Sequence, residues 1–271
     1  LVKGNYFFDT GSWDHELKFG FRYKDGTVDS FSKYSQADMI STKYYTPNYV
    51  YLYRELNTSV DMEYTNFWVG DTILHGPWTI NAGFHYSDQS GVQAASVANP
   101  NGTFPTLIEG VDFGGFDPGF SWSDISPRIG VTYTFDWEKR LMLRGSYAQY
   151  ADQLGSGTVS YNLPLSYVGV RYDWNDLNGN DIVEDGELVD QDGSGTIDCG
   201  DSTGSFNIDP CNTGAVSSPF QIDRNLSAPT VDELGLGVDW ELARDFVLGL
   251  NYTMRQRANI IWTPIYNATA F

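Results

Sequence analysis

The sequence predicts an all-β fold, an antiparallel transmembrane β-barrel present in part, with long extracellular loops. Apolar residues alternate with polar ones in segments of about 9–11 residues, the length of a tilted strand that crosses a bilayer. Aromatic residues gather near the segment ends, and the connections alternate between short and long. A soluble β-sandwich is the alternative, because alternation by itself also suits two packed sheets.

Composition excludes several other classes of protein. The 271 residues carry a formal charge of −19 and 15% aromatic residues, too many aromatics for a disordered polyacid. No basic stripe is present to neutralise phosphates, so we expect no nucleic-acid partner and look to metal cations instead. No stretch approaches the roughly 18 consecutive apolar residues of a membrane helix.

About seven segments have the alternating pattern of a strand in a barrel wall. In residues 16–24, Leu17, Phe19, Phe21 and Tyr23 fall on one face, and charged residues or glycine fall on the other. The predicted strands are residues 16–24, a weaker one at about 59–71, then 78–86, 128–136, 141–149, 234–242 and 246–254.

The connections predict which end of each strand faces outward. The links at 72–77, 137–139 and 243–245 are short and indicate periplasmic turns, as does the chain start at 1–10. The links at about 25–58, 88–125 and 150–231 have the length of extracellular loops. Residues 49–56 and 167–172 also have strand character. Each lies alone in a link whose two ends are on the same side of the membrane, and such a link can contain only an even number of crossings. We therefore expect these two strands to project above the membrane.

Three segments resemble the barrel of TonB-dependent outer-membrane receptors, with the greatest similarity to the Oar-like branch. They are TGSWDHELKFGFRY at 10–23, NFWVGDTILHGPWTINAGFHYSDQ at 66–89 and SPRIGVTYTFDWEKRLMLRGSYAQYADQL at 126–154. The resemblance implies a barrel of about 22 strands. Residues 1–271 would then be a fragment of a single barrel domain, with the family's plug domain not in this chain.

The resemblance also implies location, partners and activity. The chain would lie in the outer membrane of a Gram-negative bacterium, with its loops facing the exterior. Its partners would be membrane lipid, its own plug, the TonB complex and an unidentified extracellular ligand that it binds and imports without catalysis. Four arginines of the polar strand faces are candidate contacts to the plug or to an anionic ligand, with ion pairs to carboxylates as the equal alternative: Arg22, Arg128, Arg144 and Arg255.

The loop at 151–231 contains an acidic stretch with two consecutive calcium-type registers. Ca²⁺ takes six to eight oxygen ligands, which an EF-type loop supplies from positions 1, 3, 5, 7, 9 and 12. The first register gives Asp176, Asn178, Asn180, the carbonyl of Ile182, Glu184 and Glu187; the second gives Asp190, Asp192, Ser194, the carbonyl of Thr196, Asp198 and Asp201. Asp181 replaces the usual glycine of the first register, and a solvated loop without metal is the alternative.

Two cysteines, Cys199 and Cys211, lie close together in this polar region and favour a disulfide over a thiol active site. Bound Ca²⁺ and this bridge would make the loop rigid. If the fold were a sandwich, the same features would indicate a calcium-binding adhesin or binding module. A barrel hydrolase that uses His85 is the remaining hypothesis, without readable partners for that side chain.

Overall fold

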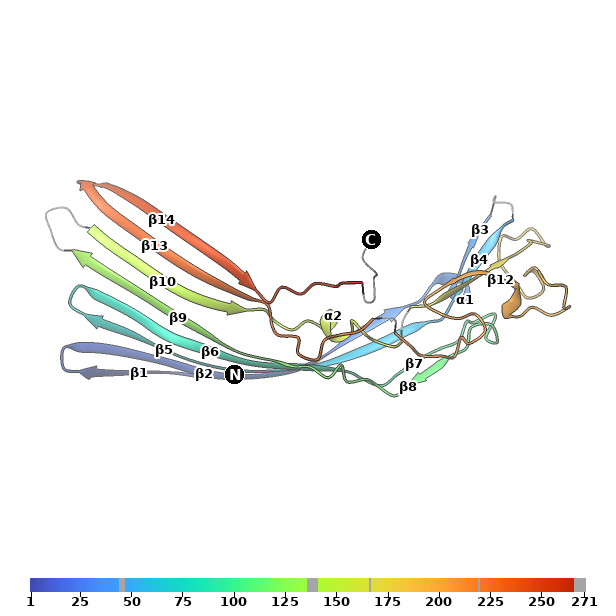
Figure 1. Cartoon of the computed structure of the whole chain (residues 1–271), viewed down its shortest axis with the longest axis horizontal. Helices are drawn as coiled ribbons and strands as arrows, with labels where there is room; N and C mark the ends of the chain where they lie inside the picture. Colours follow the sequence, from blue (N-terminus) through green and yellow to red (C-terminus); the bar gives the residue numbers. More distant parts are fainter. Residues whose placement is uncertain (44–46, 136–140, 166, 219, 266–271) are drawn as a thin grey trace.

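The computed structural model describes residues 1–43, 47–135, 141–165, 167–218 and 220–265. It consists of one long, curved antiparallel sheet and a smaller head built from the connections between its strands (Figure 1). None of the helices in these residues is long and apolar enough to cross a membrane.

Eight strands form the long sheet, and each pairs with its neighbours in order along the chain. They are β1 (Val2–Thr10), β2 (Trp13–Ser32), β5 (Leu56–His75), β6 (Trp78–Gln93), β9 (Trp122–Phe135), β10 (Leu141–Ala151), β13 (Thr230–Ala243) and β14 (Phe246–Ala258). The antiparallel all-β prediction is confirmed. The sheet is a single open layer with β1 and β14 at its edges, not a closed barrel and not a sandwich (Figure 1).

The prediction of a turn at 1–10 is wrong, because these residues form strand β1 and bring the sheet to eight strands. β1 pairs with β2 from Val2 opposite Phe21 to Thr10 opposite Trp13. The turn itself is Gly11 and Ser12, where Gly11 has a φ of 70°. Three adjacent aromatic residues at positions 6–8 obscure the alternation of this strand.

Two predicted boundaries are also wrong, because the strands are longer than the apolar pattern. β2 and β5 pair from Asp14 opposite Leu74 to Ser32 opposite Leu56, which includes part of the predicted loop at 25–58. β5 continues to His75, so the predicted turn at 72–77 shrinks to Gly76 and Pro77. The turn at 243–245 is present between β13 and β14, and the one at 137–139 lies outside the described residues.

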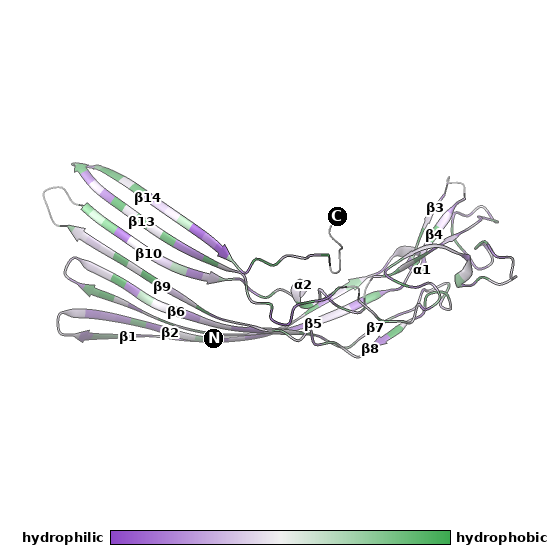
Figure 2. Cartoon of the chain, in the orientation of Figure 1, coloured by the Kyte–Doolittle hydropathy of each residue, from purple (hydrophilic) through white to green (hydrophobic). Residues whose placement is uncertain are grey.

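The long sheet has an apolar face and a polar face. The pairing places Phe19, Val69, Phe84 and Pro127 in one row across four strands, and Arg22, Asn66 and Ser87 in a row on the opposite face. Figure 2 shows the resulting alternation of hydropathy along the strands. Phe19, Phe67 and Phe84 of the apolar face are about two-fifths exposed, as suits a surface that lipid would cover.

The head contains a four-stranded sheet with its own core. Its order is β12 (Ser202–Phe206), β11 (Gly169–Asp173), β4 (Tyr49–Tyr53) and β3 (Met39–Thr42). β4 and β11 confirm the two strands predicted beyond the long sheet, although Leu56 belongs to β5. Val50, Leu52, Val170, Tyr172 and Trp174 are buried at its centre.

The remaining elements of the head are short. β7 (Ser96–Ala98) pairs with β8 (Val111–Phe113). α1 (Ser35–Asp38) and α2 (Ser156–Val159) are single turns, and the 3₁₀ turn η1 (Cys199–Asp201) precedes β12. The head therefore rests on long strands that continue from the sheet, most directly on β2, β5 and β6 (Figure 1).

Candidate functional site

The first acidic register, residues 176–187, folds around the carboxylate of Asp176. This carboxylate accepts the backbone N–H groups of Gly179 at 2.7 Å, Asn180 at 3.1 Å and Asp181 at 3.2 Å. Asp181 has a φ of 63°, so aspartate adopts the left-handed conformation that usually selects glycine in such a turn. The turn therefore forms with aspartate at the position where such loops usually have glycine.

The second register, residues 190–201, repeats this backbone arrangement. Asp190 accepts the N–H groups of Gly193 at 2.7 Å, Ser194 at 3.2 Å and Gly195 at 2.7 Å. These bonds stabilise the charged carboxylate and lower the pKa of Asp190, with the bond from Gly195 as the largest cause. The two registers are thus equivalent turns, each built by an aspartate at position 1.

The carboxylates at position 12 also have equivalent places. Glu187 accepts the N–H of Leu177 at 2.9 Å, and Asp201 accepts the N–H of Gln191 at 2.6 Å. Each carboxylate closes its loop onto position 2 and so lies beside the turn. The apolar residue at position 8 anchors each loop, since Val183 is buried in the head core and Ile197 packs against it.

The registers differ in the cation that the chain itself supplies. Lys43, just beyond β3, donates to Asp176 at 2.8 Å and also contacts Asp181. Its hydrogen bond lowers the pKa of Asp176 to about 2, and the two carboxylates raise the pKa of Lys43. Sequence reasoning missed Lys43, because 133 residues separate it from Asp176 and nothing local marks the pairing.

The second register has no such cation among the described residues and brings three carboxylates together. Oxygen atoms of Asp190, Asp192 and Asp201 lie within 4.8 Å of one another. The Ser194 hydroxyl donates to the Thr196 carbonyl at 2.8 Å. These donors are all oxygen, the ligand type that Ca²⁺ prefers, so the residues present fit that ion.

The other predicted calcium ligands differ between the two registers in the groups that they contact. In the first register, Glu184 accepts from the amides of Asn178 at 2.7 Å and Asn180 at 3.2 Å, so these three side chains meet. Asp198 instead caps η1 by accepting from Gly200 at 2.7 Å. Ile182 is 42% exposed at the loop surface.

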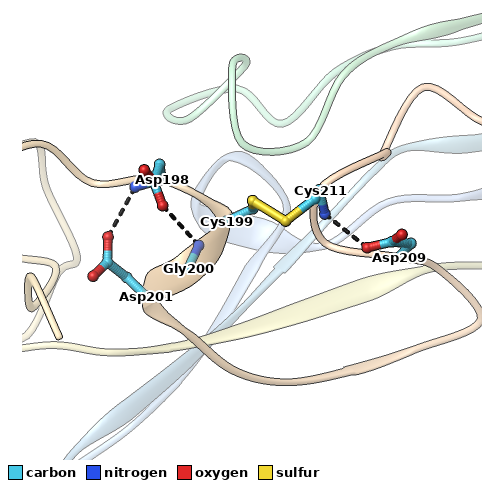
Figure 3. The surroundings of a disulfide bond; sticks show 6 residues. All are labelled: Asp198, Cys199, Gly200, Asp201, Asp209 and Cys211. Carbon is cyan, nitrogen blue, oxygen red and sulfur yellow. Dashed lines mark hydrogen bonds between the residues drawn. A yellow bond between two sulfur atoms is a disulfide. The ribbon is translucent and has the colours of Figure 1, made fainter. Parts of the chain in front are cut away.

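The disulfide between Cys199 and Cys211 is present, as predicted (Figure 3). Cys199 begins η1 between Asp198 and Asp201, which are joined by the N–H of Asp198 to the Asp201 carboxylate at 2.9 Å. The bridge therefore connects the end of the second register to the segment that follows β12. Closing a loop of this length restricts the unfolded chain and contributes on the order of 3 kcal/mol.

The four candidate arginines of the polar face divide into two pairs. Arg144 forms an ion pair with Asp239 at 2.6 Å, and Arg255 forms one with Glu233 at 2.5 Å. Arg22 and Arg128 form no ion pair within the described part of the chain, and both line one cavity beneath the head. The same cavity contains His85 and two basic residues that sequence reasoning missed, Lys3 and Lys24.

A polar group on the apolar face also escaped sequence analysis. His15 and Asp71 are joined at 2.6 Å, and the other ring nitrogen of His15 lies 2.8 Å from the Thr10 hydroxyl. The Phe8 ring stacks on the imidazole at 4.6 Å. Pairing reduces the cost of placing these groups among apolar residues.

Comparison with known proteins supports an assignment for the chain. The family described as "Outer membrane beta barrel domain" matches residues 12–270. No curated protein and no solved structure matches the chain. The match covers the head and every strand of the long sheet except β1, and it agrees with the alternating faces of the strands, which implies association with membrane lipid. The chain therefore belongs to the outer membrane beta barrel domain family.

Proposed function

We propose that this chain is the barrel portion of a TonB-dependent outer-membrane receptor that binds an extracellular ligand and imports it. The observation that carries the proposal is the large head, which continues directly from strands of an outer-membrane barrel domain. A receptor needs such structured loops to capture a ligand, and loops of this length are functional in most proteins. The resemblance of residues 10–23, 66–89 and 126–154 to the receptor family adds the TonB dependence and the plug.

The adhesin alternative has less support. It requires two packed sheets, whereas the long sheet is a single layer with a membrane-type apolar face. The hydrolase alternative needs a base and a nucleophile in contact with His85. Within the described residues, no hydrogen bond joins that ring to a hydroxyl or carboxylate, so binding and gating remain the better proposal.

Import can be tested while the ligand is still unidentified. Strains lacking either this gene or the TonB protein are grown in rich medium, and the compounds left in the spent medium are compared. We expect a compound that the parent consumes to remain in both mutant cultures. If every compound that remains in the culture of the gene-deletion strain is still consumed by the strain lacking TonB, the proposal of TonB-dependent import is wrong.

Calcium is the second part of the proposal, with the head as its binding place. Ca²⁺ would bind chiefly in the second register, through Asp190, Asp192 and Asp201, because no ammonium group of the described residues pairs with these carboxylates. In the first register Lys43 already neutralises part of the charge. As in other extracellular modules, the expected Kd is on the order of 10⁻⁴–10⁻³ M.

Removal of calcium should loosen the head but not the long sheet. With a chelator, we expect faster proteolysis between residues 173 and 223 while the strands of the sheet stay protected, because like charges are left unneutralised. The double substitution Asp190→Asn and Asp192→Asn should make cleavage independent of calcium. Asp185→Asn is the matched control, since it removes a charge from the same stretch outside the ligand positions. Equal cleavage with and without calcium in the unsubstituted protein would contradict a structural calcium site.

A further inference from the structure

Four basic side chains surround a single cavity on the polar face, and none of them forms an ion pair with another residue that the structure describes. Lys3 of β1, Arg22 and Lys24 of β2, and Arg128 of β9 all line it. The chain has 16 Lys and Arg against 35 Asp and Glu, so a basic residue has many carboxylates to pair with. Elsewhere on this face, Arg144 and Arg255 have such partners. The four cations around the cavity therefore represent a local excess of positive charge.

Aromatic rings hold two of these cations in place. The Arg128 guanidinium lies 5.0 Å from the centre of the Tyr150 ring, and the Lys24 ammonium lies 5.5 Å from that of Tyr64. A ring face orients a cation but carries no net charge, so the cation can still bind an anion. Tyr64 is itself fixed, because its hydroxyl donates to the Leu154 carbonyl at 2.8 Å.

The remaining wall combines uncharged polar groups with aromatic side chains such as Trp68, and the head forms one side of it. Gln89 donates to the Asp152 carbonyl at 3.2 Å and accepts the N–H of Leu154 at 2.8 Å, so this segment lies across the polar face. Asn66, Ser87 and Ser126 supply further hydrogen-bonding groups. Among the described residues that line the cavity, Asp152 is the one carboxylate, against four Lys and Arg side chains.

The size of the cavity suits a small ligand. Its volume is about 580 Å³, within the usual range for small-molecule sites. Arginine and lysine bind carboxylate, phosphate and sulfate oxygens through charge-assisted hydrogen bonds. We propose that this cavity binds a small polyanion through Arg22, Arg128, Lys3 and Lys24. Binding of the polyanion does not depend on the proposed import function. Its identification as the transported ligand does rest on that function.

The test uses the protein purified in detergent from outer membranes, with pyrophosphate and citrate as probes at low ionic strength. Isothermal titration calorimetry should detect binding of at least one probe. The double variant Arg22→Gln and Arg128→Gln should weaken it by about tenfold or more, since it removes two charged donors. The matched control, Arg144→Gln and Arg255→Gln, removes the same charge from the same face and should leave the affinity within about threefold of the original, because these arginines act at a distance.

Three results would overturn the proposal: unchanged binding in the Arg22 and Arg128 variant, an equal loss in the control, or no binding by the unsubstituted protein. The experiments distinguish a failure of the proposed anion binding from a failure of the proposed import. Binding without TonB-dependent uptake would refute import only, and uptake that survives the loss of binding would refute the cavity only.

Discussion

Lys43 shows how one distant residue distinguishes two loops of similar local sequence. Asp176 and Asp190 accept equivalent backbone bonds, but among the residues that the structure describes an ammonium group pairs with Asp176 alone of the two. The local pattern predicts two calcium loops, with the second as the better match, and the contacts add a cation of the chain itself to the first of them. That distinction could not be predicted from spacing, because it depends on how β3 packs in the head.

The pKa of Asp176 leads to a prediction about acid. Because Lys43 lowers this pKa to about 2 from an ordinary value near 3.9, the pair stabilises the first register above that ordinary value. This stability is lost as the pH falls through about 2. Hydrogen exchange at the backbone amides of Gly179, Asn180 and Asp181 can be measured without calcium and corrected for intrinsic rates. These amides should lose their protection from exchange as the pH falls from the ordinary pKa of aspartate to about 2.

Lys43→Met is the informative variant for this measurement. Without the ammonium group the pKa of Asp176 rises, so protection should disappear at a higher pH than in the unsubstituted protein. The amides of Gly193, Ser194 and Gly195 in the second register serve as an internal control and should be unaffected. Loss of protection at the same pH with and without Lys43 would show that the pair does not stabilise this turn.

Two glycines opposite each other in β5 and β6 offer a second test at the level of single residues. A Cβ atom on Gly83 would lie 2.5 Å from the Val69 carbonyl oxygen, whereas one on Gly70 would meet nothing closer than 3.7 Å. Backbone cannot move aside as a side chain can. We therefore expect Gly83→Ala to lower the free energy of unfolding by about 1–3 kcal/mol, and Gly70→Ala to change it far less.

Urea unfolding in lipid vesicles would measure both variants. Similar midpoints for Gly83→Ala and Gly70→Ala would mean that β5 and β6 do not approach each other as closely as described.

At the scale of elements, the strands that contact lipid could be predicted well, because one face must be apolar there. Strand β14 is an example, with Leu248, Leu250, Tyr252 and Met254 on a single face. The apolar pattern no longer predicts the strands where they leave the lipid, because neither face has to be apolar there. Beyond the membrane, β2 and β5 stay paired through residues such as Thr27 opposite Asp61, with no need for an apolar face.

The lengths of the strands explain how the head is attached. β2 and β5 each have 20 residues, about twice the roughly 9–11 that a bilayer crossing needs. The second half of β2 and the first half of β5, which pair with each other, therefore extend past the membrane and carry the head. The head strands β4 and β11 could be predicted from parity, but their packing into one sheet with β3 and β12 depends on contacts between distant segments.

At the scale of the whole molecule, the alternating polar and apolar faces establish the general architecture. Ion pairs then distinguish which of the candidate arginines are available to bind a ligand. The sequence suggested four arginines as contacts, and the structure divides them into two with carboxylate partners and two beside an open cavity. The acidic loops lie at the far end of the head, away from the long sheet (Figure 1).

The central claim is that the long sheet is the membrane-embedded wall of an outer-membrane barrel. It is tested most directly by gel migration of the protein after extraction from membranes, with and without boiling. We predict that extraction requires detergent and that the unboiled protein migrates differently from the boiled one, because a barrel stays folded in the detergent of the gel. A protein that remains soluble without detergent and migrates identically in both samples would contradict the account.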